Sequence, residues 1–131
     1  MNTQLHRARY MQDAIETASP ARLLTMLYDR LVRDIAGAEL AIASGTYSEV
    51  NTLLLHAQEI VLELQSSLDT RTWSGAPGLR ALYTYIYGEL IAANTTKDAA
   101  RLAVCLRIVE PLRSAWHEAA VLVAGSASRA G

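Results

Sequence analysis

Three polar residues in the middle of the chain have side chains of the types that can coordinate a metal ion. His56, Glu59 and Glu63 are separated by three and four residues, so a helix would place them on one face. Carboxylate-bridged metal bundles use Glu-x-x-His pairs on two helices and a carboxylate from each of the other two. Here the order is reversed and the sequence holds no second copy. We therefore expect a solvated polar face and no metal.

Two further groups could do chemistry. His117 and Glu118 follow Trp116 and are expected to form a surface pair. Cys105, the one cysteine, falls in an apolar helical pattern, where a free thiol packs as a small hydrophobic group. A cysteine nucleophile would need an adjacent base and a group that orients it, and the sequence gives no pattern that supports one. The sequence also has no glycine-rich phosphate-binding loop. We expect no cofactor and no enzymatic activity.

The elements that must position these residues are helices. Of 131 residues, 51% are hydrophobic but only 6% are aromatic, and phenylalanine is absent. Alanine and leucine dominate, and both favour helices. The net charge of −1 lacks the basic excess of a nucleic-acid-binding domain, and no apolar run is long enough for stable membrane insertion. A lone cysteine is typical of a reducing, cytoplasmic location.

Start and stop signals divide the chain into four helices. The expected signals are the N-cap Ser19 before Pro20, the terminating Gly45, capping boxes at Thr46-x-x-Glu49 and Thr95-x-x-Asp98, and Pro77 at the start of the third helix. Pro111 lies inside the fourth helix and either kinks or splits it; the apolar pattern continuing past it favours the kink. We predict an N-terminal arm at 1–18, a helical bundle domain at 19–124 and a frayed tail at 125–131.

Each helix carries one apolar seam. The expected seams are Leu23, Leu24, Leu27, Leu31, Ile35, Ala38 and Ile42; then Val50, Leu54, Ala57, Val61, Leu64 and Leu68; then Leu79, Leu82, Tyr83, Ile86, Leu90 and Ala93; and finally Leu102, Cys105, Val109, Leu112, Trp116, Ala119 and Val123. Short connections between long helices favour antiparallel neighbours. The prediction is an all-α, antiparallel up-down four-helix bundle with a mobile N-terminal arm or short extra helix.

Two helices carry more apolar residues than one seam needs. The surplus comprises Leu53, Leu55 and Leu62 on the second helix and Val104, Leu106, Ile108 and Leu122 on the fourth. These residues either widen the buried face or form an exposed groove that binds an amphipathic helix. Tyr83, Tyr85 and Tyr87 cannot all face one core, because residues two apart lie on opposing sides of a helix. At least Tyr85 is therefore expected to be partly exposed.

Several motifs resemble those of one known family. They are Thr17-Ala18-Ser19-Pro20 with Leu23-Leu24 and Met26-Leu27-Tyr28-Asp29, then Ala57-Gln58-Glu59-Ile60 with Glu63-Leu64 and Ser67-Leu68-Asp69, then Leu82-Tyr83-x-Tyr85 with Leu90, Ala93-Asn94 and Asp98, and Leu112-Arg113-x-x-Trp116. In order and spacing over residues 10–118, the chain resembles FliS, the flagellin-specific export chaperone of bacteria. It departs from the family at Arg30, where glycine is usual, and at Pro111, where a helix former is common.

The resemblance implies a small helical bundle without catalytic activity. Such proteins bind the disordered C-terminal segment of flagellin in the cytoplasm, prevent its premature polymerisation and deliver it to the cytoplasmic domain of the flagellar export gate. It also implies that an N-terminal arm covers part of the groove until flagellin binds. The residues expected to bind flagellin are Tyr10 and Ile15 of the arm with Leu55, Leu62, Tyr83, Tyr85, Val104 and Ile108.

Two other classes of protein stay open at this point. A self-associating structural or adaptor bundle would use the same apolar surface to form a homodimer, and a metal-binding bundle would hold iron or manganese. Other flagellar assembly regulators are left open as further partners, and neither nucleic acid nor membrane is expected to bind.

Overall fold

The computed structural model describes residues 19–130, with side chains through residue 125. The predicted arm, with Tyr10 and Ile15, and Gly131 lie outside the described residues. Four helices follow one another along the chain: α2 (Pro20–Ser44), α3 (Tyr47–Ser67), α4 (Ala76–Thr96) and α5 (Ala99–Ala130). Among these residues, none of the helices combines the length and the apolarity needed to cross a membrane.

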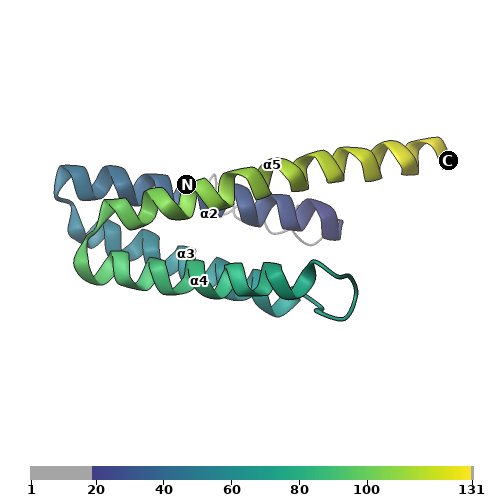
Figure 1. The fold of residues 1–131 in the computed structure, drawn as a ribbon. Helices are drawn as coiled ribbons and strands as arrows, with labels where there is room; N and C mark the ends of the chain where they lie inside the picture. Colours follow the sequence, from purple (N-terminus) through teal and green to yellow (C-terminus); the bar gives the residue numbers. More distant parts are fainter. Residues whose placement is uncertain (1–18, 131) are drawn as a thin grey trace, which may run out of the picture.

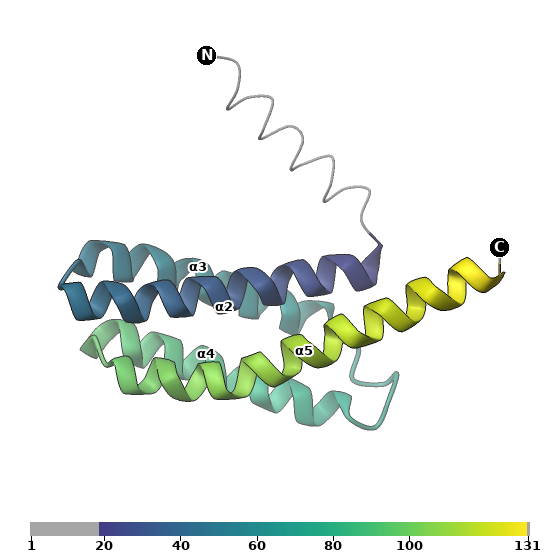
Figure 2. The same cartoon turned by 90° about the horizontal axis from the view of Figure 1, so that it is seen from above.

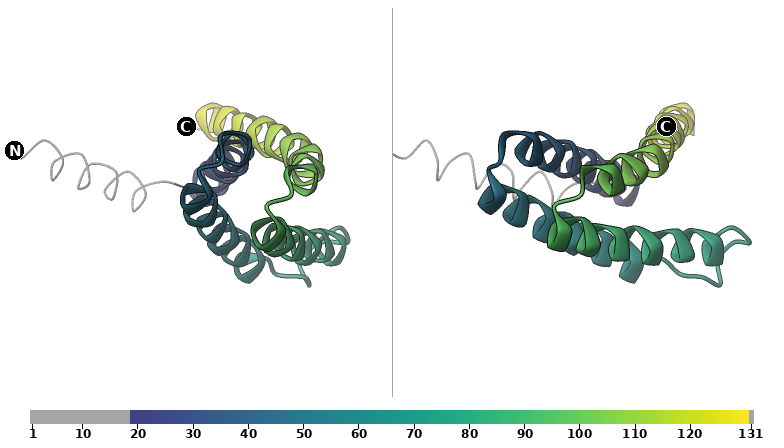
Figure 3. Two further views of the ribbon diagram at one scale, coloured as in Figure 1. Left: turned by 90° about the vertical axis from the view of Figure 1, so that its left-hand side faces the viewer. Right: turned by 60° about the vertical axis from the view of Figure 1, so that its left-hand side comes forward.

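The helices form an antiparallel bundle, as predicted (Figure 1). Helix α2 packs against α3 and α5, and α4 packs against the same two helices. Figure 3, left, looks toward one end of the bundle and shows the four helices around a common centre. Among residues 19–130, each helix therefore packs against two neighbours and keeps an outward face.

Local signals set both ends of α2 as predicted. The Arg22 N–H donates to the Ser19 side chain at 3.2 Å, which satisfies one of the free donors at the helix start. Gly45 ends the helix with φ of 74°, in the left-handed region that glycine adopts without strain. Because this stop leaves a connection of two residues, α3 must return antiparallel to α2.

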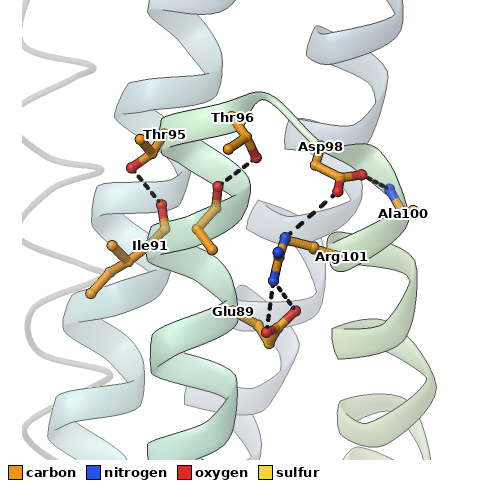
Figure 4. Close-up of polar contacts among 8 residues, drawn as sticks. Glu89, Ile91, Thr95, Thr96, Asp98, Ala100 and Arg101 are labelled. Carbon is orange, nitrogen blue, oxygen red and sulfur yellow. Dashed lines mark hydrogen bonds and ion pairs between the residues drawn. The ribbon is translucent and has the colours of Figure 1, made fainter.

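Both predicted capping boxes are wrong in their hydrogen bonds. Thr46 precedes α3, but its side chain makes no cap bond and lies 2.5 Å from the Ser44 hydroxyl, because the tight turn holds it against the end of α2. Thr95 lies within α4, where its hydroxyl donates to the Ile91 carbonyl at 3.0 Å (Figure 4). Asp98 instead accepts the Ala100 N–H at 3.0 Å and caps α5.

The core lies along the bundle centre and is mostly aliphatic. The predicted α3 seam is buried from Val50 to Leu64, with Leu68 partly buried. On α4, Leu82 is 37% exposed, so its assignment to the seam is wrong. Tyr83 faces inward in that turn, and its hydroxyl lies 2.6 Å from the hydroxyl of buried Tyr28 on α2. This pair satisfies two polar groups that burial would otherwise leave without partners.

Helix α5 is continuous through Pro111, so the alternative of two separate helices is wrong. Proline removes the bond to the carbonyl of Arg107, and both residues are exposed, so water can reach that carbonyl. Figure 2 shows α5 changing direction near the middle of its length. The helix continues to Ala130, because Gly125 alone weakens a helix without ending it.

Candidate functional site

The outer surface of α3 and α4 carries a row of apolar side chains that water partly covers. Each is between 41% and 47% exposed: Leu55, Leu62 and Ile91. Two hydrogen bonds join the helices on this side. Gln65 donates to the Thr84 hydroxyl at 2.9 Å, and Asn94 donates to the Asn51 carbonyl oxygen at 2.9 Å. The two bonds set the relative position of the antiparallel helices.

This register places apolar side chains of the two helices level with one another. Leu55 lies across from Ile91, and Leu62 lies two helix turns further along the same face of α3, since all three fall between the two hydrogen bonds. Gly88 lies one turn before Ile91 on α4, and a Cβ there would contact nothing within 4 Å. We call Leu55, Leu62 and Ile91 the α3–α4 strip. Tyr85 lies outside it, because it shares its face of α4 with Glu89, which bonds Arg101 of α5. The strip is apolar and open, which is typical of a surface that binds a partner.

Two of the predicted residues, Leu55 and Leu62, meet in the strip, whereas Tyr85 is exposed on the side of α4 toward α5. Ile91 was not predicted. Its signal was the pair Leu90-Ile91, because neighbouring residues on a helix diverge and only one can face the core. Tyr83 is 2% exposed and bonded to Tyr28, so its assignment to the exterior groove is wrong. Burial, together with the neighbouring Tyr28 hydroxyl, raises the pKa of Tyr83 far above its usual range.

The two predicted α5 residues, Val104 and Ile108, are half-buried and lie outside the strip. Ile108 packs against the core. Helix spacing places both on the side of α5 that carries Arg101, which bonds Glu89 of α4 at 3.0 Å (Figure 4). They therefore widen the buried face of α5 toward α4.

A groove of about 350 Å³ runs between α2 and α3. It is lined by Leu23, Met26, Leu27, Asp29, Arg30, Arg33, His56 and Ile60. Beneath it lies the carboxylate of Asp34, which is 1% exposed. Arg30 Nε donates to one carboxylate oxygen at 3.0 Å, and His56 Nδ1 is hydrogen-bonded to the other. We call this the α2–α3 groove; it was not predicted from the sequence, because its two sides come from different helices.

The contact with Asp34 corrects the expected solvated face on α3. Glu59 and Glu63 are exposed, as expected, but His56 is half-buried and turned toward α2. Within the described part of the chain, no three histidine, cysteine or carboxylate side chains come together as a metal site would require. His56 therefore holds two helices together through a buried carboxylate.

A second histidine also joins two helices. His117 Nε2 and Arg113 Nε of α5 contact the same Asp29 oxygen of α2, at 2.7 and 2.6 Å. Burial raises the pKa of Asp29, but the hydrogen bonds from His117 and Arg113 outweigh it and the pKa is lowered. His117 is therefore an interhelical contact, and the expected surface pair with Glu118 is wrong.

A further groove lies between α4 and α5, with a volume of about 540 Å³. Its lining is almost wholly apolar and includes Trp73, Leu82, Leu112 and Trp116.

Cys105 of α5 is buried in the core, as predicted. Burial together with the charge of Glu89 raises the pKa of its thiol to about 12. A thiol in this state is a poor nucleophile.

Comparisons with known proteins point to one family. A family model described as flagellar protein FliS matches residues 1–122. The flagellar secretion chaperone FliS of Bacillus subtilis is 34% identical over 110 residues, covering 84% of this chain and 82% of that protein. The chaperone of the same name from Escherichia coli is 26% identical over 118 residues, covering 88% and 87%.

A solved structure shares the fold. It is described as the crystal structure of a flagellar chaperone from bacteria and matches with a TM-score of 0.71 at 20% identity, covering 88% of this chain and 95% of that one. Curated relatives are named as chaperones, which indicates a flagellar export chaperone with a flagellar protein as partner and no enzymatic activity. The chain belongs to the FliS family.

Proposed function

We propose that this chaperone binds the disordered C-terminal segment of flagellin in the cytoplasm. Binding keeps the segment from polymerising before export, and the complex is delivered to the cytoplasmic domain of the flagellar export gate. The family membership supports the export role. The α3–α4 strip supports the choice of an apolar segment as the ligand.

The observation that carries this proposal is the half-exposed state of the strip residues. A disordered segment that folds on binding loses roughly 2–5 kcal/mol in ordering, which an apolar contact must offset. Covering the remaining exposed area of one leucine contributes on the order of 1 kcal/mol. A row of three such side chains therefore offsets the lower part of that ordering cost, and the two grooves add further contact area.

The test compares two leucines that differ only in position. Leu62 lies in the strip, whereas Leu40 on α2 is 73% exposed and lies outside it. Leu62→Glu should weaken binding of a flagellin C-terminal segment by at least about ten-fold, since it removes apolar contact and places a charge in the interface. Leu40→Glu should leave the affinity within about two-fold, because that side chain stays in water.

Isothermal titration calorimetry on the full chain measures both affinities, with circular dichroism as the check that each variant is folded. Equal weakening by the two variants would contradict a role for the strip, and no binding to the unmodified chain would contradict the proposed function.

Self-association through the strip is the competing use of the same residues. Light scattering over a range of protein concentrations distinguishes it. If the mass rises with concentration and Leu62→Glu abolishes that rise without affecting flagellin binding, the strip forms a homodimer and is not the flagellin site.

A further inference from the structure

The α2–α3 groove combines an apolar floor with a cationic edge. The floor is formed by Leu23, Met26, Leu27 and Ile60. The edge is formed by Arg30 and Arg33, which are three residues apart on α2 and so lie on the same side of the helix. Helices α2 and α3 pack against each other as neighbours in the bundle (Figure 2).

Asp34 holds one arginine of the edge in position. Its carboxylate is buried beneath the groove and accepts a hydrogen bond from Arg30 Nε at 3.0 Å. No bond is recorded from the two terminal nitrogens of Arg30 to any group in residues 19–125. A guanidinium held through Nε presents these nitrogens as a ready pair of donors, which matches the geometry of a carboxylate.

The other charges near the groove leave this edge positive. Asp29 lines the groove, but its carboxylate is matched by Arg113 and His117 of α5. Over the same described residues, Arg33 has no recorded ion pair. The exposed carboxylates of Glu59 and Glu63 project from α3, on the opposite margin. A ligand with a negative side must therefore place that side against α2.

We propose that the α2–α3 groove binds an acidic amphipathic helix. An apolar side chain of that helix enters the floor, and an Asp or Glu about one turn away accepts hydrogen bonds from Arg30 and Arg33. This inference rests on the proposed function. It adds an orientation for the bound segment, which the apolar α3–α4 strip does not set, because apolar contact has no direction whereas a carboxylate paired at one margin of the groove does.

The test uses two probes and two variants of the full chain. The probes are a flagellin C-terminal segment and the same segment with every Asp and Glu changed to Asn and Gln. The variants are Arg33→Gln and, as a control for the lost charge, Arg107→Gln, which removes an exposed arginine of α5. Arg33 is preferred to Arg30 because it makes no recorded contact with buried Asp34.

We expect the native segment to bind Arg33→Gln about five-fold more weakly than the unmodified chain. The neutralised segment should bind both chains with nearly equal affinity, and Arg107→Gln should behave like the unmodified chain with both probes. Added salt should reduce the difference between the probes, since the contact is electrostatic.

The outcomes separate this inference from the proposed function. If neither probe binds the unmodified chain, the proposed function fails and this inference fails with it. If the native segment binds the unmodified chain and Arg33→Gln equally, the proposed function stands and the acidic contact is refuted.

Discussion

The buried carboxylate of Asp34 predicts that removing its two partners destabilises the fold more than removing the carboxylate itself, because the partners are partly exposed and Asp34 is not. Asp34 is 1% exposed, whereas the side chains of Arg30 and His56 are 52% and 41% exposed. Asp34→Asn removes the charge and leaves two partners that water can hydrate. Arg30→Met with His56→Leu removes both partners and leaves a negative charge buried between α2 and α3. The second change should therefore cost far more stability than the first.

The magnitudes follow from these exposures. A buried charge that loses its partners costs about 3–5 kcal/mol, whereas the loss of one hydrogen-bonded contact costs about 1 kcal/mol. Unfolding a chain of 131 residues carries an entropy of roughly 0.28 kcal/mol/K. The Tm should then fall by about 11–18 °C for the double variant and by about 4 °C for Asp34→Asn. A triple variant that combines all three changes should be more stable than the double variant.

Thermal and urea unfolding, followed by far-ultraviolet circular dichroism, measure these differences. The reasoning is refuted if the triple variant is no more stable than the double variant, or if Asp34→Asn costs as much as the double change. Either result would mean that the Asp34 carboxylate reaches water in the folded chain and that burial does not set its energetics.

Three further predictions concern other buried or paired groups. The pKa of Asp29 is lower in the folded chain than in the unfolded chain, so its charge stabilises the fold above the unfolded pKa, and that contribution disappears as the pH falls through the folded pKa. Asp29→Asn should therefore lower the free energy of unfolding by less than about 1 kcal/mol at neutral pH and leave it unchanged in strong acid. Urea unfolding midpoints measured across pH check this. Tyr83→Phe should cost about 1–2 kcal/mol because it leaves the buried Tyr28 hydroxyl unpaired, and the double change to phenylalanine should cost less than the sum of the single changes. The Cys105 thiol, with a pKa of about 12, should react with a thiol reagent at mildly alkaline pH only as fast as the chain unfolds.

Each of these has a result that would contradict it. An unchanged acid limb in Asp29→Asn would show that the α5 cations do not stabilise its charge. Additive costs in the tyrosine pair would show that the two hydroxyls do not depend on each other. Labelling of Cys105 faster than global unfolding would reveal local opening of α5.

Features that depend on one helix alone were predictable from the sequence. The α3 seam, the Ser19 cap and the Gly45 stop follow from helical periodicity and from side-chain and backbone preferences within a few residues. Leu55, Leu62 and Tyr85 were identified as surface candidates for the same reason, because a helix of known period separates its buried residues from the rest. The same period assigned Tyr83 to the seam and Tyr85 to the outside, as the structure has them, so it was only the listing of Tyr83 among the flagellin-binding residues that was wrong.

Features that join two helices were decided by the tertiary structure. Arg30 and Asp34 are four residues apart on one helix, a spacing that favours their contact, but His56 of α3 is 22 positions away from Asp34 and contacts the same carboxylate. Thr46 failed as a cap because the turn beside α2 offered its hydroxyl a nearer partner. Sequence alone determined four amphipathic helices and their order, since those depend on local interactions. The grooves, the interhelical carboxylates and the α3–α4 strip depend on register between helices, which is set only when the side chains of all four pack together.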